Sequence, residues 1–206
     1  MLAYLFWHRP RDAAATASYE RAQIAFHRSL AHAPPVGFQG SVALRVAQLP
    51  CRLSGLTGPR PPGEEDGSGY EDWYFLEDYG ALGVLNEAAV GRGHRTAHDD
   101  VARRSGASAG GLYGLIEGHR PGPLAATSLA VWVAGPPRSG RYALGELLGD
   151  GIDPRHASLW RRQLVLGPAP EFCLLAPEQP AGVSPARLPQ GWQATALERE
   201  TLWAGP

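Results

Sequence analysis

Histidine is the side chain in this sequence with the widest chemical range, because it titrates near neutral pH and binds metals through either ring nitrogen. Three isolated histidines, His8, His27 and His119, are candidates for proton transfer or for axial ligation of a haem iron. A lone histidine also serves in many proteins as a structural hydrogen-bonding group. Residue type alone therefore leaves both interpretations open.

His94 and His98 are four residues apart, a spacing that can place two zinc ligands on one face of a helix. Thr96, however, has the form of an N-cap, with Asp99 as the acid three residues further on. Such a cap would leave His94 outside the helix, and no glutamate follows it as the HExxH pattern requires. We therefore expect exposed histidines at a helix end and no metal site.

The remaining motifs give no signal for a nucleotide or a nucleophile. The segment 105–111, SGASAGG, is rich in glycine but lacks both the GxGxxG spacing and a P-loop lysine, so a turn is expected. Residues 106–110 (GASAG) match the GxSxG spacing by letter, but this segment is expected to be a turn, so no nucleophilic serine is expected. Cys51 and Cys173 form no CxxC pair, and two reduced thiols are expected. The sequence thus predicts no cofactor.

The composition narrows the class of protein. A chain of 206 residues, 44% of them hydrophobic, can bury a large core in one large or two small domains. The net charge of −1 argues against a nucleic-acid-binding protein. Every basic residue is arginine, as expected from a GC-rich bacterial genome. The apolar run 2–7 is too short for a signal peptide or a membrane span, so we expect a cytoplasmic protein without a membrane partner.

The first half of the chain predicts the elements that would position these residues. Apolar or alternating runs predict strands at 2–7, 41–49, 70–76 and 112–117. Asp12 is a suitable N-cap for a helix from residue 13 to about 31, with an apolar stripe at spacings of three and four. A second helix is predicted to end near Val90 and a short one to span 96–104, whereas 54–69 is predicted to be a loop. This order, β-α-β-β-α-β, is ferredoxin-like.

The second half suggests a shortened copy of the first. A strand at 129–133 ends at two prolines, a helix is predicted at 142–148, and runs at 163–166 and 172–175 flank a Gly-Pro turn. The segment 192–203 predicts a last strand, but no second helix is evident. A true repeat and a chance similarity of two strands that end at proline both fit this pattern.

This order of elements resembles the dimeric α/β-barrel superfamily. The resemblance covers about 120 residues by element order and the remainder in part, without a motif for any named family. It implies an α+β fold made of a ferredoxin-like unit at 1–122 and a shortened second unit at 128–206. It further implies a homodimer in which two sheets pack face to face. Cofactor-free monooxygenases, isomerases and haem-degrading enzymes belong to this superfamily, so the fold alone does not assign a function.

The resemblance also implies a cavity inside the barrel. If the apolar face of the second strand (Val42, Leu44, Val46) meets the helices, Arg45 points inward. The more polar faces of the other strands complete the predicted pocket, which holds Tyr4, Phe6 and His8, then Tyr74 beside Asp72, then Tyr113 and Glu117. We expect His8 to act as acid or base and Arg45 to orient an anionic group. An Arg45–Glu117 ion pair without function is the alternative.

We therefore expect a small-molecule-binding protein or a cofactor-free enzyme of the monooxygenase or isomerase kind, with an apolar cavity. The reaction would be proton transfer or oxygen insertion at an aromatic or polyketide-like ligand. Whether the chain is an enzyme stays open. The alternatives are a non-catalytic homodimeric assembly protein, whose barrel is filled by its own tryptophans and tyrosines, and a haem-binding protein.

Overall fold

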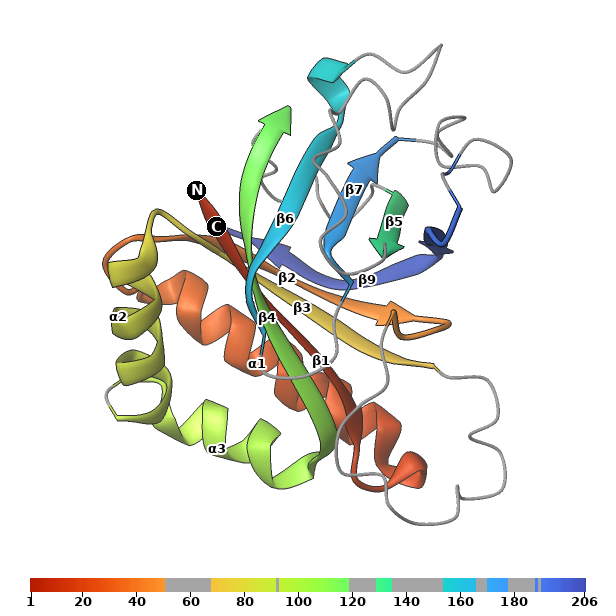
Figure 1. Cartoon of the computed structure of the whole chain (residues 1–206). Coiled ribbons are helices and arrows are strands. Elements are labelled where there is room, and N and C mark those ends of the chain that lie inside the picture. The colour runs from red at the N-terminus through yellow and green to blue at the C-terminus, as the bar shows by residue number, and fades with distance from the viewer. Residues whose placement is uncertain are drawn as a thin grey trace.

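The computed structural model describes residues 1–50, 68–91, 93–118, 129–134, 154–165, 170–177, 188 and 190–206. Over these ranges the chain is an α+β protein, with three α-helices on one face of a nine-stranded sheet (Figure 1). No helix in these ranges is both long and apolar enough to cross a membrane. The helix predicted at 142–148 lies outside the described residues, as do Cys51, His119 and most of the loop predicted at 54–69.

The sheet draws its strands from the whole chain. They are β1 (Leu2–Pro10), β2 (Phe38–Val46), β3 (Gly69–Leu76), β4 (Ser105–Gly118), β5 (Leu129–Ala134), β6 (Ser158–Val165), β7 (Phe172–Ala176), β8 (Gln193–Leu197) and β9 (Arg199–Gly205). Their order is β8-β5-β7-β6-β4-β1-β3-β2-β9, and every neighbouring pair is antiparallel. The strands predicted in both halves are confirmed, with shifted ends.

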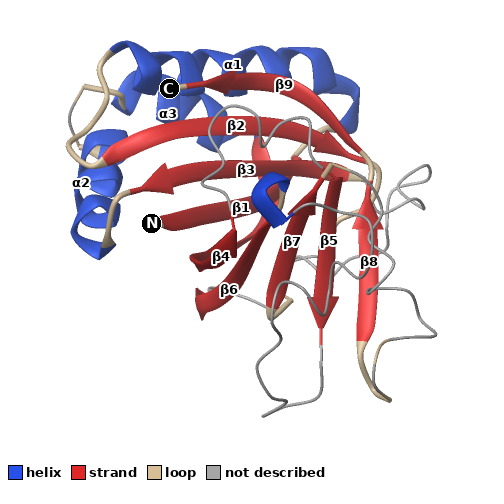
Figure 2. Ribbon diagram, turned by 90° about the horizontal axis from the view of Figure 1, so that it is seen from above, coloured by secondary structure: helices blue, strands red, loops and turns tan. Residues whose placement is uncertain are grey.

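The sheet curls until its two edge strands are neighbours in the chain (Figure 2). β8 pairs with β5 and β9 pairs with β2, yet Glu198 alone separates β8 from β9. The last strand predicted from the sequence is thus one segment that changes partner at Glu198. The curl gives the sheet an inner face, which carries Leu5 and Trp7, and an outer face, which carries Tyr4 and Phe6.

Three helices cover the outer face of β4, β1, β3 and β2: α1 (Thr16–His32), α2 (Tyr79–Val90) and α3 (Arg95–Arg104) (Figure 1). Asp12 accepts a hydrogen bond from the backbone N of Ala14 (2.9 Å) at a 3-10 turn (Ala13–Ala15) that leads into α1. Asp78 caps α2 through the backbone N of Ala81 (2.9 Å). The cap predicted at Asp12 is therefore confirmed in position, although the α-helix proper starts at Thr16.

Two predictions about α3 were wrong: the identity of its N-cap residue and the exposure of His94. His94, not Thr96, stands at the N-cap position. Its ring is buried between Ser29 Oγ (Nδ1, 3.1 Å) and the carbonyl of Ala33 (Nε2, 3.0 Å), so it links α3 to the end of α1. A long-range contact, which no local pattern encodes, therefore decides where this helix begins.

The glycine-rich segment 105–111 is not a turn but the first half of β4, which runs from Ser105 to Gly118. Two glycines there give room to large neighbours. A Cβ on Gly110 would lie 3.2 Å from the hydroxyl of Tyr4, and a Cβ on Gly111 would lie 2.9 Å from the ring of Tyr113. Glycine in a strand marks such a close approach, which explains why a strand here resembles a turn in sequence.

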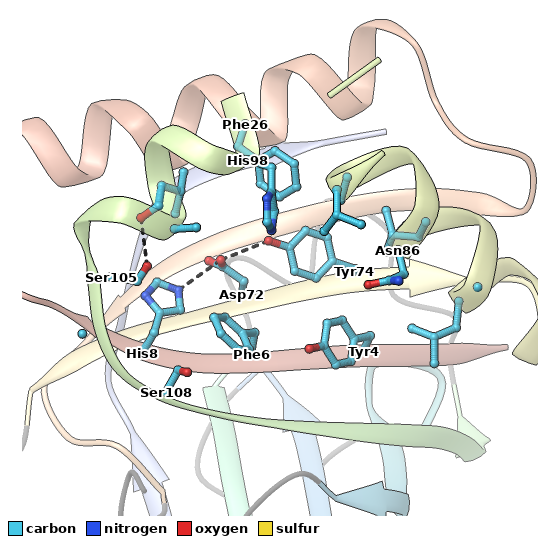
Figure 3. A pocket seen from close by; sticks show the side chains of 18 of the residues that line it. Tyr4, Phe6, His8, Phe26, Asp72, Tyr74, Asn86, His98, Ser105 and Ser108 are labelled. Atoms are coloured by element: carbon cyan, nitrogen blue, oxygen red, sulfur yellow. Dashed lines mark hydrogen bonds and ion pairs between the residues drawn. The ribbon is translucent and has the colours of Figure 1, made fainter. Parts of the chain in front are cut away.

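The predicted orientation of the first three strands was also wrong. Tyr4, Phe6 and His8 lie on the outer face beneath the helices (Figure 3), whereas Val42, Leu44 and Val46 lie on the inner face. Arg45 consequently points outward. Only on β4 was the predicted face right, since Tyr113 faces inward and Leu112 packs under the helices. The pairing of Ala3 with Tyr113 and of Tyr4 with Leu112 fixes the sides of β1 and β4 together.

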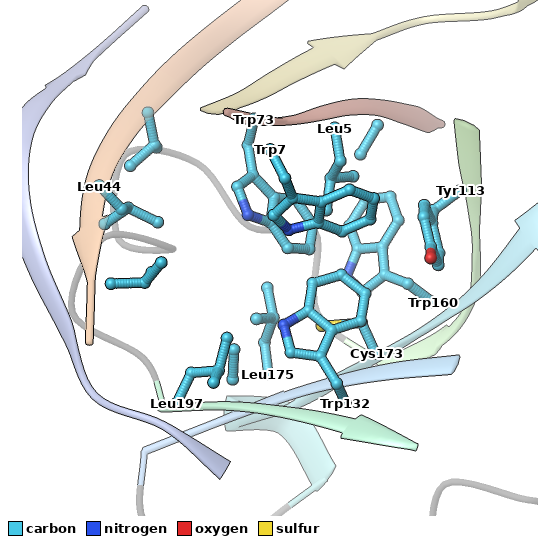
Figure 4. Close-up of a cluster of buried hydrophobic side chains, with 14 of the residues drawn as sticks. Leu5, Trp7, Leu44, Trp73, Tyr113, Trp132, Trp160, Cys173, Leu175 and Leu197 are labelled. Atoms are coloured by element: carbon cyan, nitrogen blue, oxygen red, sulfur yellow. The ribbon is translucent and has the colours of Figure 1, made fainter. Parts of the chain in front are cut away.

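The inner face is filled by aromatic side chains. Trp7, Trp73, Trp132 and Trp160 are essentially inaccessible to solvent and meet at ring-centroid distances of 5.3–6.1 Å (Figure 4). Each tryptophan removes a large apolar area from water, so this cluster is a major part of the core. The predicted barrel cavity is thus occupied by tryptophan over the described strands.

A buried ion pair lies among these tryptophans. Glu71 is fully buried and receives hydrogen bonds from the indole nitrogens of Trp7 (2.9 Å) and Trp73 (2.7 Å). Arg199 Nη1, at the start of β9, donates to the same carboxylate at 3.3 Å. The pair joins β3 to the last strand across the inner face. A charge so deeply buried is tolerated only when it is paired and hydrogen-bonded.

Candidate functional site

A cavity of about 730 Å³ lies between the outer face of the sheet and the helices (Figure 3). Side chains from β1, β3 and β4 form its floor, and residues of α2 and α3 form its roof. This volume is within the range of small-molecule sites, which are mostly apolar with a few polar groups. The cavity therefore lies on the opposite face of the sheet from the one predicted.

The floor of the cavity is aromatic. Tyr4 stacks on Tyr74 with ring centroids 6.1 Å apart and lies 6.4 Å from Phe6. The interplanar angles are 28° and 33°, so neighbouring rings form a gently inclined surface. Gly110 of β4 leaves room for the Tyr4 hydroxyl on the same face. Such a floor suits a flat apolar molecule, because aromatic rings stack on one another.

The roof is built from small and aliphatic residues. Gly83 and Ala89 of α2 and Val101 and Ala102 of α3 line it, and Asn86 adds an amide. A Cβ on Gly83 would meet no atom within 4 Å, so the cavity is open at that point. Because these side chains are small, they leave the space between the helices and the aromatic floor unfilled.

Asp72 of β3 is the centre of the polar part of the site. Its Oδ2 lies 3.1 Å from His8 Nε2, 3.1 Å from the Tyr74 hydroxyl and 3.4 Å from His27 Nε2. Gln23 Nε2 donates to Oδ1 at 3.1 Å. Asp72, His8 and Tyr74 all line the cavity (Figure 3), whereas His27 is not among its lining residues. Four donors around one buried carboxylate form a dense hydrogen-bonded network.

The charge of this network follows from the environment of Asp72. Its burial alone would raise the pKa of the carboxyl group, but the nearby His8 and His27 and their hydrogen bonds outweigh burial and hold the pKa of Asp72 well below its usual range. Asp72 is therefore ionised at neutral pH and can only accept hydrogen bonds. A nitrogen at hydrogen-bonding distance from it must carry a proton.

The other nitrogen of His8 faces α1. Nδ1 lies 2.5 Å from the hydroxyl of Tyr19, which is also 3.1 Å from Ser105 Oγ at the start of β4. The imidazole stacks on the ring of Tyr70 at a centroid distance of 5.6 Å and an interplanar angle of 11°. Both ring nitrogens of His8 thus have hydrogen-bonding partners, and one face of the ring is covered by Tyr70.

Burial keeps the tyrosines around Asp72 protonated. It raises the pKa of Tyr19 and of Tyr74, and the negative charge of Asp72 raises both further. Burial and the hydrogen bond to Glu20 raise the pKa of Tyr70 to about 12. The phenol groups are therefore hydrogen-bond donors at neutral pH.

Helix α1 supplies three members of this network from one stripe. Tyr19, Gln23 and His27 are each four residues apart, so they lie above one another on the face turned to the sheet. His27 Nδ1 is held by Ser41 Oγ of β2 at 2.8 Å. This polar stripe was not predicted, because the apolar stripe beside it gives the stronger helical signal in the sequence. The spacing Tyr19-x3-Gln23-x3-His27 would have revealed it.

The structure divides the residues predicted for the site into two groups. Tyr4, Phe6, His8 and Tyr74 line the cavity. Tyr113 is packed in the inner core against Trp7, and its hydroxyl donates to the carbonyl of Pro170 at 2.7 Å. Glu117 is exposed near the end of β4. These two residues do not line the cavity.

Arg45 also lies away from the cavity, and its predicted ion pair with Glu117 is not formed. Its guanidinium binds Glu20 of α1 (Nη2–Oε1, 2.6 Å) and Glu200 of β9. The hydrogen bond to Glu20 raises the pKa of Arg45. The role of orienting an anionic group therefore does not fit Arg45. Arg11, an exposed arginine at the cavity wall, is placed where such a group would need it.

His8 and His27 do not suit the role of haem ligand considered from the sequence. Within the described part of the chain, no group of three or more His, Cys, Asp or Glu residues is arranged to hold a metal ion. Both ring nitrogens of His8 are engaged by Tyr19 and Asp72, and those of His27 by Ser41 and Asp72. An axial ligand needs a free ring nitrogen.

Comparison with known proteins gives a structural likeness but no sequence match. No family model matches the sequence, and no curated protein matches it either. One solved structure, described as a crystal structure study of an anthrone oxidase-like protein, aligns with 98% of this chain and 93% of its own. The TM-score is 0.48 and the sequence identity is 10%. A likeness at this level says nothing about the function of the present chain.

Proposed function

We propose that the chain binds a small, flat, largely apolar molecule in the cavity between the sheet and the helices. The single observation that carries this proposal is the cavity itself, with an aromatic floor of Tyr4, Phe6 and Tyr74 and a polar wall at Asp72. An aromatic or polyketide-like ligand with a hydroxyl or keto group matches both surfaces, because its rings can stack while its oxygen meets the polar wall.

The proposed activity is proton transfer to or from this ligand, with His8 as acid or base. Asp72 orients the imidazole through Nε2 and would stabilise the imidazolium that forms when His8 takes up a proton. The same proton removal would prepare an electron-rich aromatic ligand for reaction with molecular oxygen. That reaction with molecular oxygen would be the oxygen insertion expected from the sequence. In either case the groups that act are side chains of the protein and the ligand.

Binding can be tested with N-phenyl-1-naphthylamine, a neutral aromatic probe that becomes fluorescent in apolar surroundings. Ala102→Trp would place an indole at the exposed roof of the cavity and should weaken probe binding by roughly tenfold or more. Ala17→Trp, on an exposed turn of α1 away from the cavity, is the matched control and should leave the affinity unchanged. Equal affinity in all three proteins would contradict a ligand site in this cavity.

Proton transfer can be tested with 5-nitrobenzisoxazole, which opens to a coloured phenolate when a base removes its carbon-bound proton. The protein should accelerate this reaction, and His8→Ala should lower the rate by about a hundredfold. Binding of the naphthylamine probe by wild type and by His8→Ala would show that the cavity remains intact. No difference in rate between the two proteins would remove the proposed role of His8 and leave a binding protein.

A non-catalytic assembly protein is the second candidate, and the inner core favours it. Four tryptophans and Tyr113 fill the inner face, as this alternative requires. The two candidates differ in the outer cavity, which an assembly protein would not need. Failure of every aromatic probe to bind would therefore favour the assembly protein.

The fold can also be specified more finely as a proposal. We infer that residues 1–122 and 128–206 are two ferredoxin-like units, the second one shortened. The orders β4-β1-β3-β2 and β8-β5-β7-β6 support this, because each strand of the second set stands where its counterpart stands in the first. The two units would join where β4 pairs with β6 and where β9 pairs with β2.

A further inference from the structure

The hydroxyl groups near His8 form a chain that ends at the cavity. Ser105 lines the cavity, Tyr19 lies between Ser105 and His8, and His8 lies between Tyr19 and Asp72. The successive distances are 3.1 Å from Ser105 Oγ to Tyr19 Oη, 2.5 Å from Tyr19 Oη to His8 Nδ1 and 3.1 Å from His8 Nε2 to Asp72 Oδ2. Each step is within hydrogen-bonding distance.

The proton positions along this chain can be counted. Ser105 Oγ donates its only proton to the carbonyl of Val101 (3.0 Å), so it can only accept from Tyr19. His8 Nε2 lies 3.1 Å from the ionised Asp72 and 3.1 Å from Gln23 Nε2, and we place a proton on it because the carboxylate can only accept. The single proton of Tyr19 can therefore point either to His8 Nδ1 or to Ser105 Oγ.

Both charge states of His8 fit this arrangement without movement of a heavy atom. When the imidazole is neutral, Tyr19 donates to Nδ1. When it is an imidazolium, Nδ1 donates to Tyr19 and the proton of Tyr19 turns to Ser105. The chain Ser105–Tyr19–His8 thus keeps its hydrogen bonds before and after proton uptake, which is the preorganisation that proton transfer requires.

We propose that His8 exchanges its proton with a ligand in the cavity through Tyr19 and Ser105. This inference rests on the proposed function of the cavity. After rotation of its hydroxyl, Ser105 passes its proton to Tyr19 as it receives one from the ligand, and Tyr19 passes its own to His8 Nδ1. The ligand is left with the electron pair of the broken bond, and the imidazole gains one positive charge. Tyr19, which does not line the cavity, is a positioning residue.

The proposal is tested on ligand-free protein by ¹⁵N nuclear magnetic resonance of the His8 ring. Spectra between about pH 5 and pH 9 report which nitrogen carries a proton, and the linewidth of the Nδ1 proton reports its exchange with solvent. We expect the proton of the neutral ring on Nε2. Ser105→Ala and Tyr19→Phe should each slow exchange at Nδ1 by about tenfold or more, because the hydroxyl path is broken. Ser105→Thr should restore the wild-type rate.

Ser108→Ala is the matched control. Ser108 also lines the cavity and lies opposite His8 in the strand register, but it makes no hydrogen bond to Tyr19. Its removal should leave exchange unchanged. A wild-type exchange rate in Ser105→Ala, or a neutral ring protonated on Nδ1, would overturn the proposal. Because these spectra need no ligand, loss of the relay and loss of probe binding are separate results.

Discussion

Asp72 is the residue on which the polar wall of the cavity depends. It binds side chains from β1, β3 and α1 and thereby links the sheet to the helix that covers it. A buried carboxylate without such partners would be strongly disfavoured. The same contacts give His8 its fixed orientation. Stability and the proposed chemistry therefore rest on one group, and substitution of this group should affect both.

Asp72→Asn should lower the free energy of unfolding at pH 7 by about 3–5 kcal/mol, as expected when one partner of a buried charged cluster is removed. The pKa of Asp72 is depressed in the folded state, so the unfolded chain binds more protons as the pH falls. The stabilisation is thus complete above about pH 4, the ordinary value of an aspartate, and is lost below it. Urea unfolding between about pH 2 and pH 7 should show a shallower acid dependence in the variant.

Asp100→Asn provides the control for this measurement. Asp100 pairs with Arg104 on the exposed face of α3, where an ion pair contributes little. Its substitution should change the unfolding free energy by at most about 0.5 kcal/mol. The same acid dependence in wild type and Asp72→Asn would show that the neighbouring histidines do not stabilise an ionised Asp72.

A separate prediction concerns Glu71, which is next to Asp72 in sequence but lies on the inner face. Glu71→Gln removes the buried carboxylate that accepts from Arg199, Trp7 and Trp73 and should cost about 3–5 kcal/mol in urea unfolding. The double variant Glu71→Gln/Arg199→Met should recover part of this loss, because an apolar side chain then replaces the charge. Additive losses in the double variant would contradict a direct coupling of the two residues.

At the scale of the elements, most strands and helices could be predicted from sequence, but their faces could not. Alternation along residues 41–49 showed that β2 has one apolar face, yet both sides of this sheet are buried. Alternation cannot tell which buried side is the more polar. Asp72 shows the same limit: it was recognised as polar within YEDWYFL, but two of its partners, Gln23 and His27, come from a helix far earlier in the chain.

Two glycines separate the effect of helix propensity from that of backbone geometry. Gly83 lies within α2 in open space, so Gly83→Ala should raise the free energy of unfolding by about 0.5–1 kcal/mol. Gly37, in the turn before β2, has φ +79°, and a Cβ there would lie 2.5 Å from that of Ala81. Gly37→Ala should destabilise by more than about 1 kcal/mol in the same thermal or urea unfolding series. Equal effects of the two substitutions would contradict the described turn.

The whole molecule raises the question of assembly. The homodimer predicted from the sequence stays a prediction, but the edges of the first four strands are already occupied within the chain. β4 pairs with β6, and β2 pairs with β9. A second chain cannot add to an edge that has no free backbone groups. A dimer of this protein would therefore have to use a surface other than these two edges.

We accordingly expect native mass spectrometry to report one chain of 22.0 kDa at micromolar concentration. A species of twice that mass would support the predicted homodimer, with an interface away from the paired edges of β4 and β2. The exposed apolar residues of α2, Tyr79, Val84 and Val90, would then be the first surface to examine. Val84→Glu would put a charge in that surface and should dissociate such a dimer, whereas a dimer that persists in Val84→Glu would exclude α2 as the interface. The same spectra would show any ligand retained in the cavity, because a bound molecule adds its mass to that of the chain.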